Sequence, residues 1–149
     1  MASSIEVNGL SEVITRMQAY PDRLKAVLTA TMDAAMLVLW ESVPPYPAPP
    51  ANSSYDRTGT LGRSLGSSEG GGTGGGHPSI YEIKELGSGY EGHFGTNLDY
   101  APYVIGDDDQ SAFMYHWWQM KDVAAAASDK INRIFADMGS QLKSFLEGG

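Results

Sequence analysis

Two long stretches of the chain carry apolar residues at the three- and four-residue spacing of an amphipathic helix. The first stretch begins at Pro21, a residue suited to the first position of a helix, and continues for about six turns until Pro44-Pro45 ends it. The apolar stripes consist of Leu24, Val27, Leu28, Thr31, Ala35, Val38, Leu39 and Ser42 in the first stretch, and of Val123, Ala127, Ile131, Ile134, Phe135, Met138, Leu142, Phe145 and Leu146 in the second. This pattern predicts two long helices, the second from about residue 119 to 146.

In the part of the chain between the two predicted helices, apolar and polar residues alternate strictly. This alternation predicts a β-hairpin formed by residues 79–85 and 90–96. The alternating residues are Tyr81 and Ile83 in the first stretch and Tyr90, Gly92 and Phe94 in the second. The glycine-containing residues 87–89 between them favour a tight turn. Near the start of the chain, residues 4–8 alternate in the same way, and an apolar face follows over residues 10–17. We therefore expect a short strand and a helix there as well.

The predicted elements fit one α+β domain over residues 1–149, in which the N-terminal and C-terminal helices pack on a small antiparallel sheet. Residues 44–57 form a proline-rich strap, because five prolines within residues 44–50 favour an extended, polyproline-like conformation. Residues 66–78 form a glycine-rich loop. With seven glycines in residues 66–76, this segment cannot bury enough apolar surface to offset its ordering entropy, so we expect it to be flexible.

The composition excludes several classes of function. With 18 acidic and 10 basic residues, the chain has a net charge of −8, which argues against binding to a phosphate backbone. The absence of cysteine excludes disulfides, thiolate metal sites and a cysteine nucleophile. The first residues do not resemble a signal peptide, and the most apolar window, residues 34–40, is too short to span a bilayer. We expect a soluble protein without a membrane partner.

Residues 62–66 match the G-x-S-x-G motif of α/β-hydrolases, with Ser64 followed by Asp99 and His116 in the chain order of that triad. A nucleophile elbow needs a buried strand before the serine and a helix after it. Here a Thr-Gly-Thr segment precedes Ser64 and a glycine-rich loop follows. We interpret the match as coincidence and expect no catalytic residue.

Other residues that could carry chemistry lack the required context. Two G-x-G-x-x-G matches, at residues 70–75 and 87–92, do not lie between a strand and a helix, as a dinucleotide site requires. Asp107, Asp108 and Asp109 are consecutive and lack the alternating spacing of a calcium loop. The three histidines have no ligand spacing. We therefore expect neither a cofactor nor a metal ion.

The largest aromatic cluster lies at residues 113–118, with the sequence Phe-Met-Tyr-His-Trp-Trp. In an isolated domain such a cluster would pack into the core beside the last helix. Trp and Tyr also dominate the binding hot spots of protein interfaces, and a domain of this size has little core in which to bury three tryptophans. The sequence leaves both interpretations open.

A divided motif accompanies these elements: Val-Pro at residues 43–44, Thr-Gly-Thr-Leu-Gly-Arg-Ser at 58–64, Gly-Thr at 95–96 and Tyr-Ala-Pro-Tyr-Val at 100–104. It follows a long helix, encloses the hairpin and precedes the last helix. This order and these motifs resemble the siphophage tail-completion or head–tail joining family, a group of neck proteins related to lambda's Z protein. The resemblance extends over nearly the whole chain.

The resemblance implies a non-enzymatic structural protein at the head–tail junction of a virion, made in the cytoplasm of a bacterial host. Its subunits would form a homo-oligomeric ring between portal-side connector proteins and tail-tube or tail-terminator proteins. DNA would pass through without specific binding, and an acidic lumen suits that passage because it repels phosphates. Tail symmetry favours six copies and a portal-facing layer favours twelve. The sequence leaves the copy number and the layer open.

This interpretation assigns contact and channel roles to particular residues. Contacts between subunits or layers are expected at Pro45, Tyr46, Tyr55, Arg57, Arg63, Tyr100, Tyr103, Phe113, Trp117 and Trp118. The residues expected to face the channel are Asp107, Asp108 and Asp109. Three alternatives remain: a tail terminator, a small serine hydrolase that uses Ser64, and a monomeric peptide-binding module that uses residues 113–118.

Overall fold

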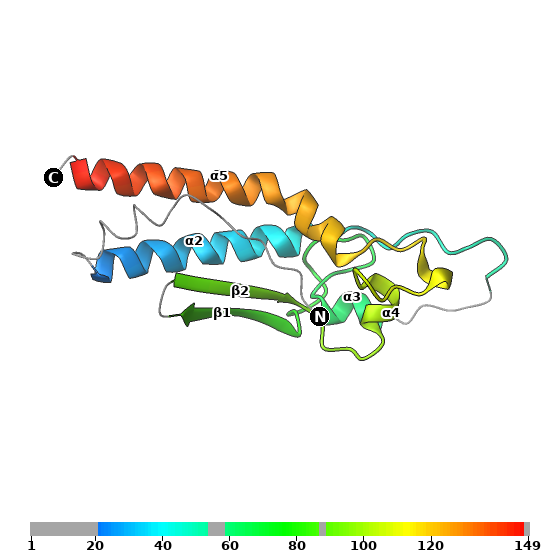
Figure 1. Ribbon diagram of the computed structural model, residues 1–149. Helices are drawn as coiled ribbons and strands as arrows, with labels where there is room; N and C mark the ends of the chain where they lie inside the picture. The colour runs from blue at the N-terminus through cyan, green and yellow to red at the C-terminus, as the bar shows by residue number, and fades with distance from the viewer. Residues whose placement is uncertain (1–20, 54–58, 87–88, 148–149) are drawn as a thin grey trace.

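The computed structural model describes residues 21–53, 59–86 and 89–147 (Figure 1). The two long helices predicted from the apolar stripes are confirmed as α2, Pro21–Glu41, and α5, Met120–Glu147. They lie side by side in antiparallel directions. The strand expected at residues 4–8 and the helix expected over residues 10–17 lie outside the described residues.

The stripes of α2 and α5 form the centre of the core because they face each other. On α5, Val123, Ala127 and Ile131 retain at most 2% of their surface exposed, and on α2 Leu28 and Met36 are buried as well. Burying Leu28, Val123 and Ile131 contributes about 1.5–3 kcal/mol each. Met36, which is not part of the predicted stripe, packs against the hairpin at Gly92.

The predicted hairpin is confirmed as β1, Ile80–Leu86, paired antiparallel with β2, Gly89–Gly95. It packs on the side of α2 away from α5, so the molecule has three layers: α5, α2 and the hairpin (Figure 1). Gly92 allows this close contact, because a Cβ at that position would lie 2.6 Å from the Sδ of Met36. The fold is therefore α+β, with the helices packed against a two-stranded antiparallel sheet.

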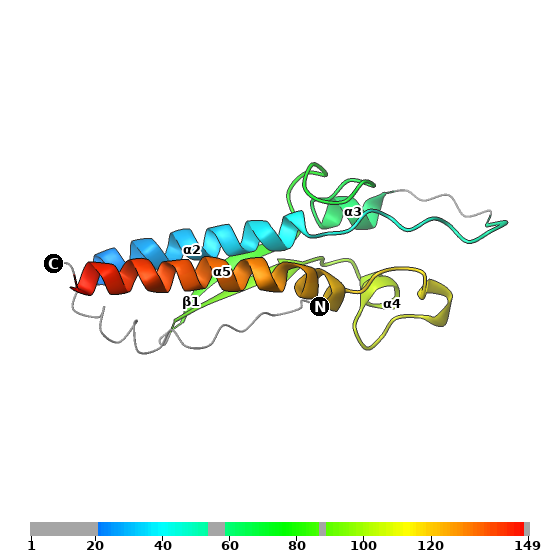
Figure 2. The same ribbon diagram turned by 90° about the horizontal axis from the view of Figure 1, so that it is seen from above.

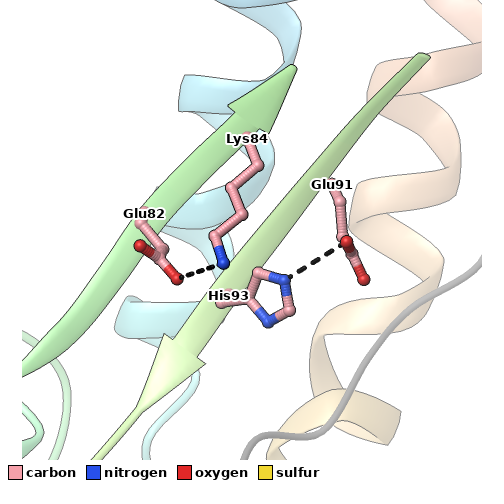
Figure 3. Close-up of polar contacts among 4 residues, drawn as sticks. All are labelled: Glu82, Lys84, Glu91 and His93. Atoms are coloured by element: carbon pink, nitrogen blue, oxygen red, sulfur yellow. Dashed lines mark ion pairs between the residues drawn. The ribbon is translucent and has the colours of Figure 1, made fainter. Parts of the chain in front are cut away.

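The outer face of the hairpin is polar. Figure 3 shows Glu82, Lys84, Glu91 and His93 together on this face. Lys84 Nζ lies 3.4 Å from Glu82 Oε1, and His93 Nε2 lies 3.5 Å from Glu91 Oε2. Exposed pairs of this kind contribute only about 0–1 kcal/mol each. They keep this side of the sheet hydrated rather than hold the fold together.

We call α2, α5 and the hairpin the stalk, and residues 42–53, 59–79 and 96–119 the lobe. The lobe lies at the end of the stalk where α2 ends and α5 begins (Figure 1). It contains three short helices that the sequence analysis did not predict: α3, Thr60–Ser64; α4, Ala101–Ile105; and the 3-10 helix η1, Ala112–Met114. Among the residues that the structure describes, no helix combines the length and apolar surface needed to cross a bilayer.

The stalk joins the lobe through Trp40 and Tyr81, whose rings both meet His77 of the lobe edge-on, at 6.2 and 5.6 Å between centroids. Trp40, in the last turn of α2, stacks edge-on against Tyr81 of β1 at 5.5 Å between ring centroids, and its indole N–H donates to the carbonyl of Gly66 at 2.8 Å. Tyr81 also meets the ring of Phe94, which is 1% exposed. Burial raises the pKa of the Tyr81 phenol, with a further contribution from the negative charges of nearby acidic residues.

Some glycines of the glycine-rich loop make specific close contacts that its composition does not indicate, while its flexibility stays a prediction. Gly71 has φ 82°, and a Cβ there would lie 2.6 Å from the backbone nitrogen of Pro45. The N–H of Gly72 donates to the carbonyl of Val43 at 2.7 Å. Here the lack of side chains lets two backbones approach each other, so residues 66–76 form a platform that holds the start of the strap.

Candidate functional site

The lobe contains a groove of about 520 Å³. Its walls come from the strap, α3, α4 and the segment between α4 and α5. The lining residues are Tyr46, Pro49, Pro50, Ser53, Gly59, Thr60, Leu61, Tyr100, Tyr103, Val104, Ser111, Phe113, Met114, His116 and Trp117. We call this feature the aromatic groove. Of the lining residues that the structure describes, none is an aspartate, glutamate, lysine or arginine, although the chain as a whole is 19% charged.

Helix α4 supplies one wall of the groove, because one side of the helix packs on the core and the other side faces the groove. Ala101 and Ile105, four residues apart, are 3% and 1% exposed and anchor the helix to the core. Tyr100 and Tyr103 are 45% and 61% exposed, and both line the groove. The Tyr-Ala-Pro-Tyr-Val motif therefore forms a short helix that buries Ala101, is anchored by Ile105 directly after the motif, and leaves its two tyrosines exposed.

Helix α3 holds Tyr46 in place on another wall. The N–H of Gly62 donates to the Tyr46 hydroxyl at 2.7 Å, and a Cβ on Gly62 would lie 2.5 Å from that oxygen. The N–H of Tyr46 itself donates to the carbonyl of Glu69 at 2.8 Å. The Tyr46 ring then packs edge-on against Trp117, with 5.0 Å between centroids. Glycine at position 62 thus fixes the ring that forms the base of the groove.

The side-chain amide of Gln110 organises the third wall. Its Nε2 lies 2.8 Å from the carbonyl oxygen of Val104 and 3.0 Å from those of Met114 and Trp117. Its Oε1 accepts a hydrogen bond from Gln119 Nε2 at 3.1 Å. One amide therefore ties together the end of α4, the end of η1 and the approach to α5. Gln110 could not be identified from the sequence, since a lone glutamine in a loop carries no periodic signal.

Two carboxylates fix the start of α5, where unpaired N–H groups and the helix dipole favour negative charge. Asp122 Oδ2 accepts from the N–H of Gln119 at 2.8 Å, and Asp107 Oδ1 accepts from the N–H of Lys121 at 2.7 Å. Asp107 is half-buried, whereas Asp108 and Asp109 are exposed. Asp107 therefore has a structural contact that distinguishes it from the other two residues expected to face a channel.

The sequence left open whether the aromatic cluster at residues 113–118 packs into the core or forms an interface. In the structure, some of its residues pack on the core and others are exposed. Trp117 and Trp118 are half-buried and pack against the core. Phe113 and Tyr115 are 87% and 70% exposed. Exposed aromatic side chains around an uncharged hollow are typical of a surface that binds a partner.

The structure brings together five of the residues predicted to make contacts: Tyr46, Tyr100, Tyr103, Phe113 and Trp117 all line the aromatic groove. Three others lie in the same lobe. Trp118 donates its indole N–H to the carbonyl of Pro45 at 3.2 Å, and Arg63 Nη2 lies 3.5 Å from Thr60 Oγ1 on α3. Tyr55 and Arg57 lie outside the described residues.

The hydroxyl of Ser64 makes packing contacts rather than an active-site arrangement. Its Oγ lies 2.6 Å from the carbonyl oxygen of Leu61 and 2.6 Å from Thr96 Oγ1. Ser64 is the last residue of α3, which no strand precedes among residues 59–86, while Asp99 and His116 are exposed. Within the described part of the chain, no three His, Asp or Glu side chains gather as metal ligands.

Comparisons of the chain with models of protein families, with curated proteins and with solved structures gave no match.

Proposed function

We propose that this protein is a structural subunit of a tailed-phage virion, of the neck or tail-completion kind, and not an enzyme. In this role its copies assemble into a ring at the head–tail junction, between portal-side connector proteins and the tail tube or its terminator. DNA passes through the ring without specific binding. The resemblance of the divided motif to the tail-completion family provides the class, and the geometry of the lobe supports it.

The observation that carries the proposal is that separated parts of the motif meet at one surface. Gly59, Thr60 and Leu61 from the second part line the aromatic groove together with Tyr100 and Tyr103 from the last part. The Ser64–Thr96 hydrogen bond joins the second part to the third, Gly-Thr at residues 95–96. A motif that builds a surface, and whose serine is used in packing, fits assembly better than catalysis.

The surface has the properties of a protein interface. Its exposed rings supply large apolar area with few rotatable bonds, the feature that makes Tyr and Phe effective contact residues. The channel role proposed for the acidic loop rests on Asp108 and Asp109, which are exposed, more than on Asp107, whose carboxylate caps α5. A ring places different surfaces of neighbouring subunits against each other, so one groove per subunit is sufficient.

Light scattering coupled to size-exclusion chromatography, followed by negative-stain electron microscopy, tests the proposal on the purified full chain. We expect closed rings of one copy number, alone or after addition of portal-side connector rings. A protein that stays monomeric at high concentration and does not bind connector or tail-tube assemblies would overturn it.

A peptide-binding module is the second candidate, because an uncharged aromatic groove lined by prolines also suits an extended peptide. The two functions differ in their response to concentration. A peptide-binding module remains a monomer and binds peptides, whereas the neck subunit assembles with itself.

A further inference from the structure

We propose that the aromatic groove of one copy receives the proline-rich strap of the neighbouring copy, through residues 47–53. This inference rests on the proposed function, because it names the contact that would link subunits in the ring. It assigns one occupant to the groove, a second copy of this chain.

The groove is suited to proline. Pro49 and Pro50 of the same chain already form part of its lining, beside Tyr46 and Trp117. A hollow of about 520 Å³ remains next to them, with Tyr103 and Phe113 exposed at its rim. Proline-rich segments dock in aromatic-lined grooves because flat rings cover the prolyl faces. They are already extended before they bind and so lose little conformational entropy.

The strap is presented to a neighbour. Its base is fixed to the glycine-rich platform through Val43 and Tyr46, and residues 48–51 are exposed. In Figure 2 the strap extends away from α2 along one side of the lobe, opposite α4. It turns at its end, where the N–H of Ser53 donates to the carbonyl of Pro50 at 3.1 Å.

Charge also selects this pairing. Each copy carries a formal charge of −8, so most contacts between copies would bring like charges together or bury them. Residues 47–53 contain no Asp, Glu, Lys or Arg, and neither do the described residues that line the groove. Contact between the strap and these lining residues therefore removes apolar area from water without burying an aspartate or glutamate.

The contact is heterologous, because the strap of one copy meets the α4 and 111–117 walls of the next copy's groove, while Pro49, Pro50 and Ser53 also line the groove of their own copy. Each copy gives a strap to one neighbour and accepts a strap from the other. Such head-to-tail contacts close into a ring when the rotation between subunits is regular. In such a ring every strap would point to the neighbour on the same side, so the ring would have one direction of rotation.

Cysteine crosslinking tests the inference directly, since the native chain has no cysteine. Ala48→Cys places a thiol on the strap and Ser111→Cys places one in the groove. Co-expression of the two single variants, followed by a short bismaleimide, should give a covalent dimer with one copy of each variant. Either variant alone should give at least tenfold less dimer. The double variant should give a ladder of covalent oligomers.

A competing peptide provides a second readout that does not depend on the variants. A peptide of residues 44–53 should bind the full-length protein, change the fluorescence of its tryptophans and slow assembly. The same peptide with Pro47→Ala, Pro49→Ala and Pro50→Ala should bind at least tenfold more weakly.

Each other outcome has a defined meaning. Rings that form without crosslinks between strap and groove would overturn the strap inference and leave the proposed function in place. A double variant that crosslinks only within one chain would do the same. A monomeric protein that binds the peptide would overturn both proposals in favour of a peptide-binding module.

Discussion

The stalk and the lobe are held together by different kinds of contact. In the stalk, apolar side chains at helical spacing face each other, and the core contains Leu28, Val123 and Ile131. The lobe also buries Leu65 and Ile105, but its groove is shaped by single side chains such as Gln110 and by glycines that allow close approach. From this difference we infer that the stalk contributes most of the stability, whereas the lobe shapes a surface.

The largest effect is expected in the stalk. Ile131→Ala removes a side chain that is 2% exposed between α5 and α2, and should lower the free energy of unfolding by about 2–5 kcal/mol. The neighbouring exposed Asn132→Ala should change it by about 0.5 kcal/mol or less. Urea denaturation followed by circular dichroism measures both. Equal stability of the two variants would show that the apolar stripe does not carry the fold.

Substitution of Gln110 is expected to disrupt the lobe while the stalk remains folded. Gln110→Glu replaces an amide nitrogen, whose two N–H groups face three carbonyl oxygens, by a carboxylate oxygen, which cannot donate, so it should cost about 1–3 kcal/mol and exceed the cost of Gln110→Ala. Hydrogen exchange should rise over residues 104–117 and stay unchanged in α2. Retained protection in Gln110→Glu would mean that the amide does not organise the lobe.

Gly62→Ala tests whether close approach shapes the groove. The new Cβ would meet the Tyr46 hydroxyl at 2.5 Å, so we expect a loss of about 1–3 kcal/mol and displacement of the ring from Trp117. Tyr46→Phe removes the hydroxyl. The double variant should therefore lose less stability than the sum of the two single variants. Additive losses would show that the two residues do not act on each other.

The smallest effect concerns the junction between the two regions. Burial raises the pKa of the Tyr81 phenol above its ordinary value of 10.0, so the folded protein holds this proton more tightly than the unfolded chain does. The corresponding stability is fully present below pH 10 and decreases as the pH rises through the folded-state pKa. Tyr81→Phe should remove this part of the alkaline decrease in denaturation experiments. An unchanged alkaline slope would contradict it.

The same difference explains what could be predicted from the sequence. The helices and the hairpin were predictable because each buries one face, so its apolar residues recur at the period of a helix or a strand. Val123, Ala127 and Ile131 follow the helical spacing along α5. The short helices α3 and α4 are only one turn long, so they leave no periodic signal. The close contacts of the glycine-rich loop could not be predicted, because composition records the absence of side chains and not the backbone contacts that this absence permits.

The candidate site was predictable in its residues but not in its shape. The tyrosines and tryptophans were identified as contact residues by type, and five of the ten residues named line one groove. The sequence could not show that Gln110 and Gly62 position them, because each acts through one contact with a residue distant in the chain. Nor could it separate exposed Phe113 from half-buried Trp117 within the same cluster.

Native mass spectrometry of matched variants tests most directly the central claim that the lobe, and not the stalk, joins copies of this protein. Phe113→Gln and Leu37→Gln each replace an exposed apolar residue, the first at the aromatic groove and the second on α2. We predict closed rings for the wild type and for Leu37→Gln, and mainly monomers for Phe113→Gln at the same concentration. Rings of Phe113→Gln as stable as the wild type, or a monomeric wild type, would contradict the account.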